Sequence, residues 1–387
     1  MKRFLLRFNY LSFAAMLALI VAGTLAIRSA GAARAVTAFH DAWQSNVSAA
    51  VTGLVVYFVL AAFDYRRYVK WCCVPAYLFA LVTLGAVLVF GTEQLGAKRW
   101  LWFFQPSELS KLCIVAFLAW LLGGRESPFA AMRERFRCFC ILGALLALPL
   151  SLILLEPDLG TALTLVPAAV LMLFIGRVWR AGLVTLLSVG GIAALLVLGS
   201  VCVMEDPRTS GATRERIERL LPLRPHQLRR IRVFLYPERD ERGEGYNLRQ
   251  SKIAIGSGGY TGTGLGRGES SRLRYLPPSV SMNDFIFCVW AEETGFVGSI
   301  ALLFCYGLLL LPCVYVAYRA TDPTGRVFAV GWTMLVFAHV YVNIGMSVGL
   351  VPITGLPLPF ISAGRTFLVT AMAGFGLIQS VSIHGRE

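Results

Sequence analysis

The chain has 387 residues, of which 57% are hydrophobic and only 15% are charged, and its formal net charge is +14. A soluble domain carries about 25% charged residues, so the composition excludes an ordinary soluble protein and is typical of a protein that lies in lipid. The basic residues stand in short clusters beside apolar runs, which argues against nucleic acid as a partner and favours anionic membrane lipids.

Apolar segments follow one another along the chain, and each is near the ~20 residues that a membrane-spanning helix needs. We expect an all-α polytopic membrane protein with about ten transmembrane helices, at residues 9–27, 47–63, 71–90, 107–122, 137–155, 160–176, 181–204, 286–318, 325–348 and 364–382. The first segment is long for a signal peptide and is interpreted as a helix. The eighth is too long for one straight span, so we expect its first part to enter the membrane edge or to line a cavity.

Basic residues recur after every second span. The positive-inside rule assigns to the cytoplasm both chain ends and the clusters at 2–7, 66–70, 125–137, 177–180 and 319–326. The chain then divides into helices one to seven (1–204), a large extracytoplasmic loop (205–283) and helices eight to ten (284–387). Within the loop we expect an amphipathic basic helix at 214–232 and a glycine-rich segment at 256–268.

Asp284 ends the long loop at the mouth of the eighth span. A carboxylate there is partly desolvated and can be tuned as a general base, although it can also cap the helix. Glu292 and Glu293 follow two turns later, and because adjacent helical residues point in different directions, we expect one to face a polar cavity and the other a neighbouring helix. His339, inside the ninth span, is expected to hydrogen-bond a neighbour rather than to catalyse.

Charged residues gather around the start of the fourth span. Lys98, Arg99 and Trp100 precede it, and cations beside an aromatic residue also suit a membrane interface. Glu108 and Lys111 lie three residues apart on one face of the helix. Charges at membrane depth are functional candidates, and the alternative is that these two only pair with each other.

Two loops add further polar groups. Glu156 and Asp158, in the turn between the fifth and sixth spans, could hold a metal ion or orient an acceptor sugar, and the alternative for Asp158 is a helix cap. Gln250 and Ser251 precede a glycine-rich stretch that lacks the Gly-Lys-Ser/Thr of a nucleotide loop. Such a stretch can still offer backbone N–H groups to a phosphate.

Three prolines within eight residues, Pro352, Pro357 and Pro359, exclude a regular helix before the last span. We expect an irregular, external re-entrant turn, which survives at membrane depth only against protein or a wet cavity. Ser362 and Arg365 stand at its end.

Five stretches together resemble one family. They are G-A-K-R-W with F-Q-P-S-E-L-S-K (96–111), E-P-D-L-G-T-A (156–162), R-Q-S-K-I-A-I-G-S-G-G with G-T-G-L-G (249–266), N-D-F-I-F with E-E-T-G-F-V-G (283–298), and N-I-G-M with G-L-V-P-I-T-G-L-P-L-P-F-I-S (343–362). They stand in family order over nearly the whole chain. On these motifs the chain is identified as a member of the SEDS family (shape, elongation, division and sporulation proteins), the group that contains RodA and FtsW.

The resemblance implies a peptidoglycan glycosyltransferase that polymerises lipid II at the outer face of the bacterial inner membrane. The family's catalytic aspartate falls on Asp284, its helix-four lysine on Lys111, and its Arg-Trp pair on Arg99 and Trp100. Asp284 would act as general base on the acceptor hydroxyl, in a single displacement with inversion. The polyprenyl pyrophosphate that leaves is anionic, which suits Arg and Lys, and a divalent cation (Mg or Mn) could help to neutralise it.

The partners implied are lipid II, the nascent glycan strand, a class B penicillin-binding protein and membrane lipids, with no nucleic acid. No metal ligands are assigned. The substrate-binding candidates are Lys111, Glu108, Arg99, Trp100, Lys98, Glu156, Asp158, Gln250, Ser251, Glu292, Glu293, Ser362 and Arg365.

The chain departs from the family after the prolines, where S-Y-G-G-S-S is replaced by Ser362-Ala-Gly-Arg-Thr-Phe. Arg365 could be an extra phosphate contact. The Arg-rich start of the long loop and its Arg-Tyr-Leu-Pro stretch (274–277) slightly favour the division branch of the family. The competing hypotheses are a transporter or flippase for the lipid-linked precursor, which needs polar groups along the whole membrane depth, and a non-catalytic scaffold, which would tolerate the loss of Asp284, Lys111 and Glu108.

Overall fold

The protein is seen here in a computed structural model that describes residues 2–32, 41–94, 97–101, 104–123, 136–156, 158–221, 223, 225–240, 243–269, 275 and 277–385. Its helices are α1 (Lys2–Arg7), α2 (Tyr10–Ala32), α4 (Ala42–Ala62), α5 (Tyr65–Phe90), α6 (Pro106–Gly123), α7 (Phe136–Leu155), α8 (Leu159–Ile175), α9 (Arg180–Glu205), α10 (Gly211–Leu220), α11 (Pro225–Leu235), the 3-10 turn η1 (Pro237–Arg239), α12 (Glu244–Ser257), α14 (Pro278–Met282), α15 (Ile286–Arg319), α16 (Pro323–Val348) and α17 (Arg365–His384). The described strands form one antiparallel hairpin, β1 (Thr92–Gln94) with β2 (Ala97–Trp100).

The all-α polytopic fold is confirmed. In the described part of the chain, nine helices are long and apolar enough to cross a membrane. The shorter apolar helix α8 adds a tenth candidate, at the sixth predicted segment. Each of the ten predicted spans overlaps one of these helices, because a sustained apolar run is itself the physical requirement for crossing lipid.

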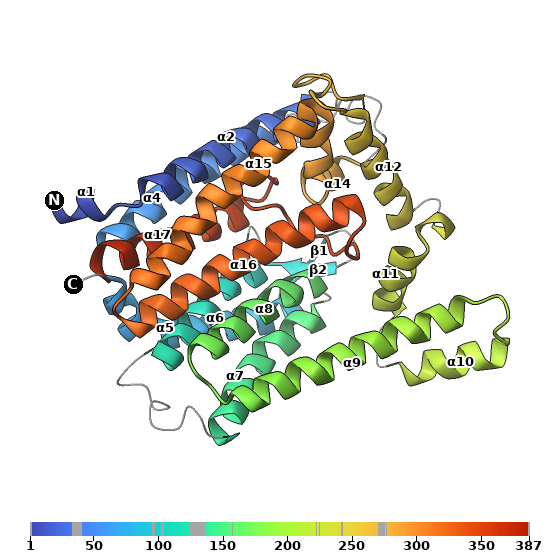
Figure 1. Cartoon of the computed structure of the whole chain (residues 1–387), viewed down its shortest axis with the longest axis horizontal. Coiled ribbons are helices and arrows are strands. Elements are labelled where there is room, and N and C mark those ends of the chain that lie inside the picture. Colours follow the sequence, from blue (N-terminus) through green and yellow to red (C-terminus); the bar gives the residue numbers. More distant parts are fainter. Residues whose placement is uncertain are drawn as a thin grey trace.

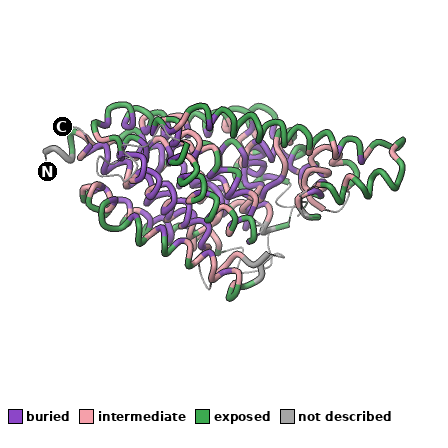
Figure 2. Tube along the Cα trace, turned by 90° about the horizontal axis from the view of Figure 1, so that it is seen from below, coloured by how far each residue is buried: buried purple, intermediate pink, exposed green. Residues whose placement is uncertain are grey.

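The long helices run roughly side by side, and the short helices α10, α11, α12 and α14 gather toward one end of the bundle (Figure 1). Helices α6, α16 and α17 are buried on most of their surface, whereas α9 is hardly buried at all. Buried residues therefore fill the interior of the bundle and exposed ones cover its outer faces (Figure 2). These three helices also carry several of the polar residues considered below, among them Glu108, Lys111 and His339, because a polar group in a bundle interior can find a protein partner that lipid cannot supply.

The two ends of the described chain lie at the same end of the bundle (Figure 1). The Ser382 hydroxyl donates a hydrogen bond to the carbonyl of Arg7 at 2.8 Å. Termini on one side are what an even number of crossings produces. Which side of the membrane they face stays a prediction from the charges.

Close backbone approach is visible where α4 packs against α17. Gly376 of α17 lies on the backbone of α4, and a Cβ there would come within 2.7 Å of the Tyr57 carbonyl oxygen. Small residues at such crossings allow the van der Waals contact that holds helices together in lipid, where the hydrophobic effect gives no preference for helix over lipid.

The eighth span is not one straight helix, as its length led us to expect. Gly295 inside α15 has φ 67° and ψ −164°, which is not helical and divides the helix into two parts. Backbone of the glycine-rich segment fills the break, because a Cβ at Gly295 would lie 2.6 Å from the Tyr260 carbonyl oxygen. Only glycine combines this dihedral with this contact at no steric cost.

Two expectations about loops have different outcomes. The single basic helix predicted at 214–232 is wrong: the chain forms α10 and α11 instead. Pro225 begins α11, a position that suits a residue without a backbone N–H. The irregular segment before the last span is confirmed, since no helix lies between Gly349 and Gly364. Its apolar residues, such as Leu356, Leu358 and Phe360, are buried against protein.

Candidate active site

A cavity of about 630 Å³ opens at the end of the bundle that carries the short helices. Its walls come from the starts of α4, α6, α8 and α17, from β2, from α11 and α12, from the α14–α15 turn, and from the irregular segment 350–364. Six of the residues expected to form the site line it: Asp284, Arg99, Trp100, Glu108, Asp158 and Arg365.

Asp284 lies in the turn between α14 and α15, and its backbone is held in place from two sides. The Asn343 amide of α16 donates to the carbonyl of Asp284 at 2.9 Å and to that of Leu356 at 2.6 Å. Gly355, with φ 73°, would place a Cβ only 3.5 Å from Asp284 Oδ2. The N-cap of α15 is Phe285, and no side chain caps it. Asp284 is therefore not a helix cap, and its carboxylate faces the cavity.

The electrostatic surroundings of Asp284 suit a base. Burial raises the pKa of its carboxyl from 3.8 to about 6. Arg99 and Arg230 pull this pKa down, and Glu244 pushes it up. A carboxyl with such a pKa is mostly ionised at neutral pH and is a stronger base than an exposed aspartate.

Arginines surround the same cavity from three elements. Arg99 of β2 donates from Nε to the Glu156 carbonyl at 3.4 Å. Arg230 of α11 donates to the Thr354 carbonyl at 3.5 Å and lies 3.7 Å from Glu244 Oε1. Arg365 is exposed at the first position of α17. These positive charges make the cavity favourable for an anionic group.

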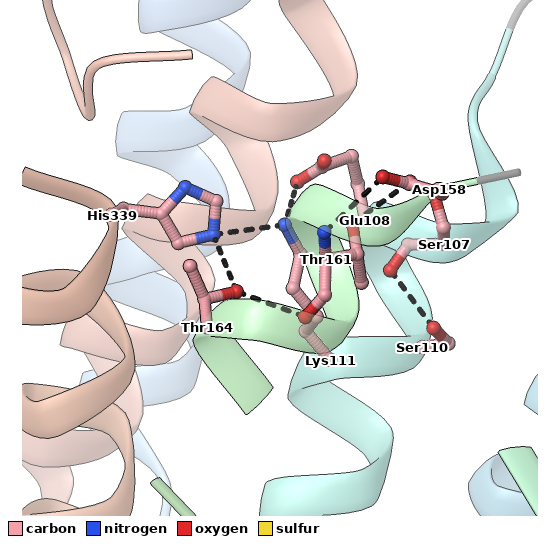
Figure 3. Close-up of polar contacts among 8 residues, drawn as sticks. All are labelled: Ser107, Glu108, Ser110, Lys111, Asp158, Thr161, Thr164 and His339. Atoms are coloured by element: carbon pink, nitrogen blue, oxygen red, sulfur yellow. Dashed lines mark hydrogen bonds and ion pairs between the residues drawn. The ribbon is translucent and has the colours of Figure 1, made fainter. Parts of the chain in front are cut away.

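A polar network joins α6, α8 and α16 (Figure 3). Lys111 Nζ lies 2.7 Å from Glu108 Oε2 and 3.0 Å from His339 Nε2. The pairing of Glu108 with Lys111 is confirmed, and Glu108 also lines the cavity. His339 has the expected polar neighbour.

Asp158 is confirmed as the cap of α8. It accepts from the Thr161 amide at 3.1 Å, from the Thr161 hydroxyl at 2.8 Å and from the Ser107 hydroxyl at 3.1 Å (Figure 3). These bonds engage both of its oxygens and join the start of α8 to the start of α6. Asp158 thus shapes the cavity wall that it lines.

Glu156 is buried beside the cavity rather than in its wall. Burial and the neighbouring Asp158 raise the pKa of its carboxyl, Arg99 lowers it, and the net pKa is about 8. Neither carboxyl oxygen has a hydrogen-bond partner within the described ranges. With a pKa of about 8, the Glu156 carboxyl is mostly protonated at neutral pH.

Several candidates lie away from the cavity wall and hold the backbone instead. Ser251 donates to the Ser347 carbonyl at 2.9 Å, and Ser362 ties together backbone groups near Asp284. Glu293 hydrogen-bonds Ser29, and the Glu292 carbonyl accepts from Thr263. The candidates that do not line the cavity are Lys111, Glu156, Gln250, Ser251, Glu292, Glu293 and Ser362. The side chain of Lys98 lies outside the described residues.

The expectation that Glu292 or Glu293 faces a polar cavity is corrected by this arrangement. Both residues pack against the glycine-rich segment: a Cβ at Gly268 would lie 3.0 Å from Glu292 Oε2 and 3.2 Å from Glu293 Cγ. Helical periodicity could not predict this contact, because the glycine-rich segment that covers Glu292 and Glu293 comes from an earlier part of the chain.

The cavity also contains residues that the sequence did not single out. Arg230 and Glu244 are the most consequential, since both act on the pKa of Asp284. Arg230 belongs to the predicted basic region, but periodicity does not tell which arginine of a surface helix turns inward. Other lining residues of this kind are Asn46, Gln105, Asn247 and Asn283.

Several known proteins that are similar to this chain come from one family. The family model of the FtsW, RodA and SpoVE cell cycle proteins matches residues 9–387. The peptidoglycan glycosyltransferase MrdB of Escherichia coli is 34% identical over 339 residues, which cover 86% of this chain and 84% of that protein. The probable peptidoglycan glycosyltransferase FtsW of Thiomicrospira cyclica is 34% identical over 392 residues, covering 96% and 90%.

A solved structure has a fold similar to that of this chain. A chain of a peptidoglycan synthase complex, studied for the structural coordination of polymerization and crosslinking, superposes with a TM-score of 0.74 at 29% identity. The match covers 97% of both chains. Because the family model covers nearly the whole sequence, the chain belongs to the FtsW/RodA/SpoVE family of cell cycle proteins.

Proposed function

We propose that the chain is a peptidoglycan glycosyltransferase that polymerises lipid II, with Asp284 as the general base. The observation that carries the proposal is the position of Asp284: a carboxylate with a pKa of about 6 faces a cavity that Arg99, Arg230 and Arg365 also line. The relatives that carry the name peptidoglycan glycosyltransferase support the same activity.

The reaction follows from this arrangement. The acceptor sugar hydroxyl gives its proton to Asp284 while its oxygen forms a bond to the anomeric carbon of the donor. The bond from that carbon to the pyrophosphate oxygen breaks, and the polyprenyl pyrophosphate leaves with the electron pair. The arginines stabilise the negative charge that develops on the leaving group.

Asp284 fits the base better than the other carboxylates of the wall. Glu108 is paired with Lys111, Asp158 accepts three hydrogen bonds and Glu244 faces Arg230. Because Asp284 acts as a base and forms no covalent intermediate with the sugar, the acceptor oxygen displaces the pyrophosphate in a single step. Such a displacement inverts the configuration at the anomeric carbon.

A divalent cation is not built into this scheme. Among the described residues, no three His, Cys, Asp or Glu side chains come together closely enough to hold a metal ion. We therefore propose that Mg or Mn would be bound mainly by the pyrophosphate of the substrate, and no step above depends on it. Polymerisation with and without EDTA measures its contribution.

The setting of the enzyme is part of the proposal. The cavity would face the outer side of the bacterial cytoplasmic membrane, with both chain ends in the cytoplasm, as the basic clusters indicate. A class B penicillin-binding protein would bind beside it and crosslink the nascent strand, in keeping with the synthase complex whose chain has this fold. The relatives named MrdB and FtsW are equally identical to this chain. Membership of the division branch therefore stays a prediction.

The test is polymerisation of purified lipid II in detergent, with and without a cognate class B penicillin-binding protein, for wild type and Asp284→Asn. We expect glycan strands from wild type and none from the variant, with thermal unfolding unchanged within a few degrees. An active Asn variant would contradict the base assignment. An inactive wild type would shift weight to a flippase, which lipid II translocation in liposomes detects, or to a scaffold, which only stimulates its partner.

A further inference from the structure

One buried polar side chain has no role in the reaction above. His339 is fully buried in α16, and it contacts Lys111 (Figure 3). We infer that His339 is a positioning residue: it fixes the Lys111 ammonium so that Glu108 presents its carboxylate to the substrate. This inference rests on the proposed function and deepens it.

Lys111 is surrounded by protein. Its ammonium lies 2.7 Å from Glu108 Oε2, 3.0 Å from His339 Nε2 and 5.2 Å from the centre of the Phe367 ring, and its side chain is 1% exposed. Lys111 is therefore enclosed by an anion, a ring nitrogen and an aromatic face. It acts on substrate only through Glu108, which does reach the cavity.

The contact defines the form of His339. A lysine ammonium has three donors and no acceptor, so His339 Nε2 must accept and can carry no proton. The ring proton then sits on Nδ1, and the imidazole is neutral. A second positive charge 3.0 Å from Lys111 would be strongly unfavourable in a bundle interior.

The opposite side of the ring connects to the cavity wall. The backbone of Pro357 lies near His339, but within the described residues it forms no regular hydrogen bond to Nδ1. The ring also packs on Phe367, with centroids 5.0 Å apart and planes 30° apart. Pro357 and Phe367 both line the cavity. His339 thus links the ion pair of α6 to two parts of the wall.

Removing the acceptor leaves one N–H of Lys111 without a partner in a dry interior, which is costly. The ammonium would then turn toward another acceptor, and Glu108 would turn with it. The substrate contact we expect at Glu108 is a hydrogen bond from a sugar hydroxyl or an amide of lipid II. A misplaced Glu108 weakens substrate binding, so the effect should appear mainly in KM.

Three substitutions separate positioning from packing. In His339→Gln the side-chain oxygen can take the place of Nε2, so we expect kcat/KM within about threefold of wild type. In His339→Asn the amide reaches only the Nδ1 position, and His339→Met has similar bulk with no comparable acceptor. For both we expect kcat/KM to fall at least tenfold, mostly through KM. Thr333→Val is the matched control, because it removes a buried polar group of the same helix, and it should leave activity unchanged.

A spectroscopic measurement needs no substrate. The chain has four histidines, so the full protein labelled with ¹⁵N-histidine gives few signals, and His339→Gln identifies the one from His339. We expect Nε2 to be unprotonated and Nδ1 to be protonated. Lys111→Met should shift the Nε2 signal.

The outcomes separate the two proposals. The role of His339 would be overturned if the Gln and Met variants were equally active at equal thermal stability. A proton on Nε2 in the wild type would overturn it as well. Neither result would contradict the glycosyltransferase function. A wild type that makes no strands with its partner present would defeat the proposed function, and would reduce His339 to a structural contact.

Discussion

The Ser362 hydroxyl donates a hydrogen bond to the backbone carbonyl of Asn283, the residue before Asp284. The same hydroxyl accepts from the Leu358 amide at 2.7 Å. One buried serine therefore joins the irregular segment to the turn that carries the base. The segment and the turn face each other across the cavity wall, so their relative position decides where the carboxylate lies.

Ser362→Ala should loosen this connection. We expect the rate of polymerisation to fall about tenfold, which corresponds to a loss of about 1.4 kcal/mol in transition-state stabilisation. We also expect the free energy of unfolding to fall by about 1–2 kcal/mol, because backbone groups lose their hydrogen-bond partner. Strand formation and thermal unfolding measure the two effects. Ser382→Ala is the control, because that buried serine also bonds one backbone carbonyl, at the far end of the bundle; equal losses in both variants would contradict the role given to Ser362.

The activity should follow the ionisation of Asp284. Its pKa is raised to about 6, and the reaction needs the deprotonated form, so kcat/KM should fall as the pH drops through 6. Arg230 lowers this pKa and Glu244 raises it. Arg230→Gln should therefore move the acid limb up by about 0.5–1 pH unit, and Glu244→Gln should move it down by a similar amount.

The pH profile of lipid II polymerisation between pH 5 and 8 tests these shifts. Arg219→Gln serves as control, because Arg219 is exposed on α10 and outside the cavity wall. Shifts of the same sign in the Arg230 and Glu244 variants would show that the limb does not report on Asp284.

Glu156 should make stability depend on pH. Burial raises the pKa of its carboxyl from 4.5 to about 8 in the folded state, so the folded state holds a proton that the unfolded state loses. The folded state is therefore progressively destabilised as pH rises from about 4.5 to 8. Glu156→Gln mimics the protonated acid, and relative to wild type it should gain about 1–3 kcal/mol between pH 5 and 8. Unfolding in detergent at several pH values measures the difference; a constant difference would contradict the buried proton.

The break in α15 should be sensitive to a single methyl group. Gly295→Ala forces φ 67° on an alanine and places its Cβ on the backbone of the glycine-rich segment. We expect a loss of about 2–4 kcal/mol in stability. Gly307 lies in the same helix with open space around it, so Gly307→Ala should be neutral or slightly stabilising. Thermal unfolding compares the two; similar losses would mean that the kink is not held by this contact.

The membrane architecture can be read from the amino-acid sequence alone. Crossing lipid requires a long apolar run in which every backbone group bonds within its own helix, so the spans can be read locally. The irregular segment before α17 and the cap at Asp158 are equally local, since prolines and capping residues act within one or two turns. The pairing of Glu108 with Lys111 follows from helical spacing alone.

Which polar residues share the cavity depends on how the helices pack in three dimensions. Arg230 and Glu244 reach Asp284 because α11 and α12 fold over the mouth of the bundle, whereas Glu292 and Glu293 are covered by the glycine-rich segment. His339 meets Lys111 because α16 crosses α6 at that depth. Such contacts depend on how helices far apart in the chain rotate and cross. Side-chain packing over the whole bundle sets that rotation, and no local pattern contains it.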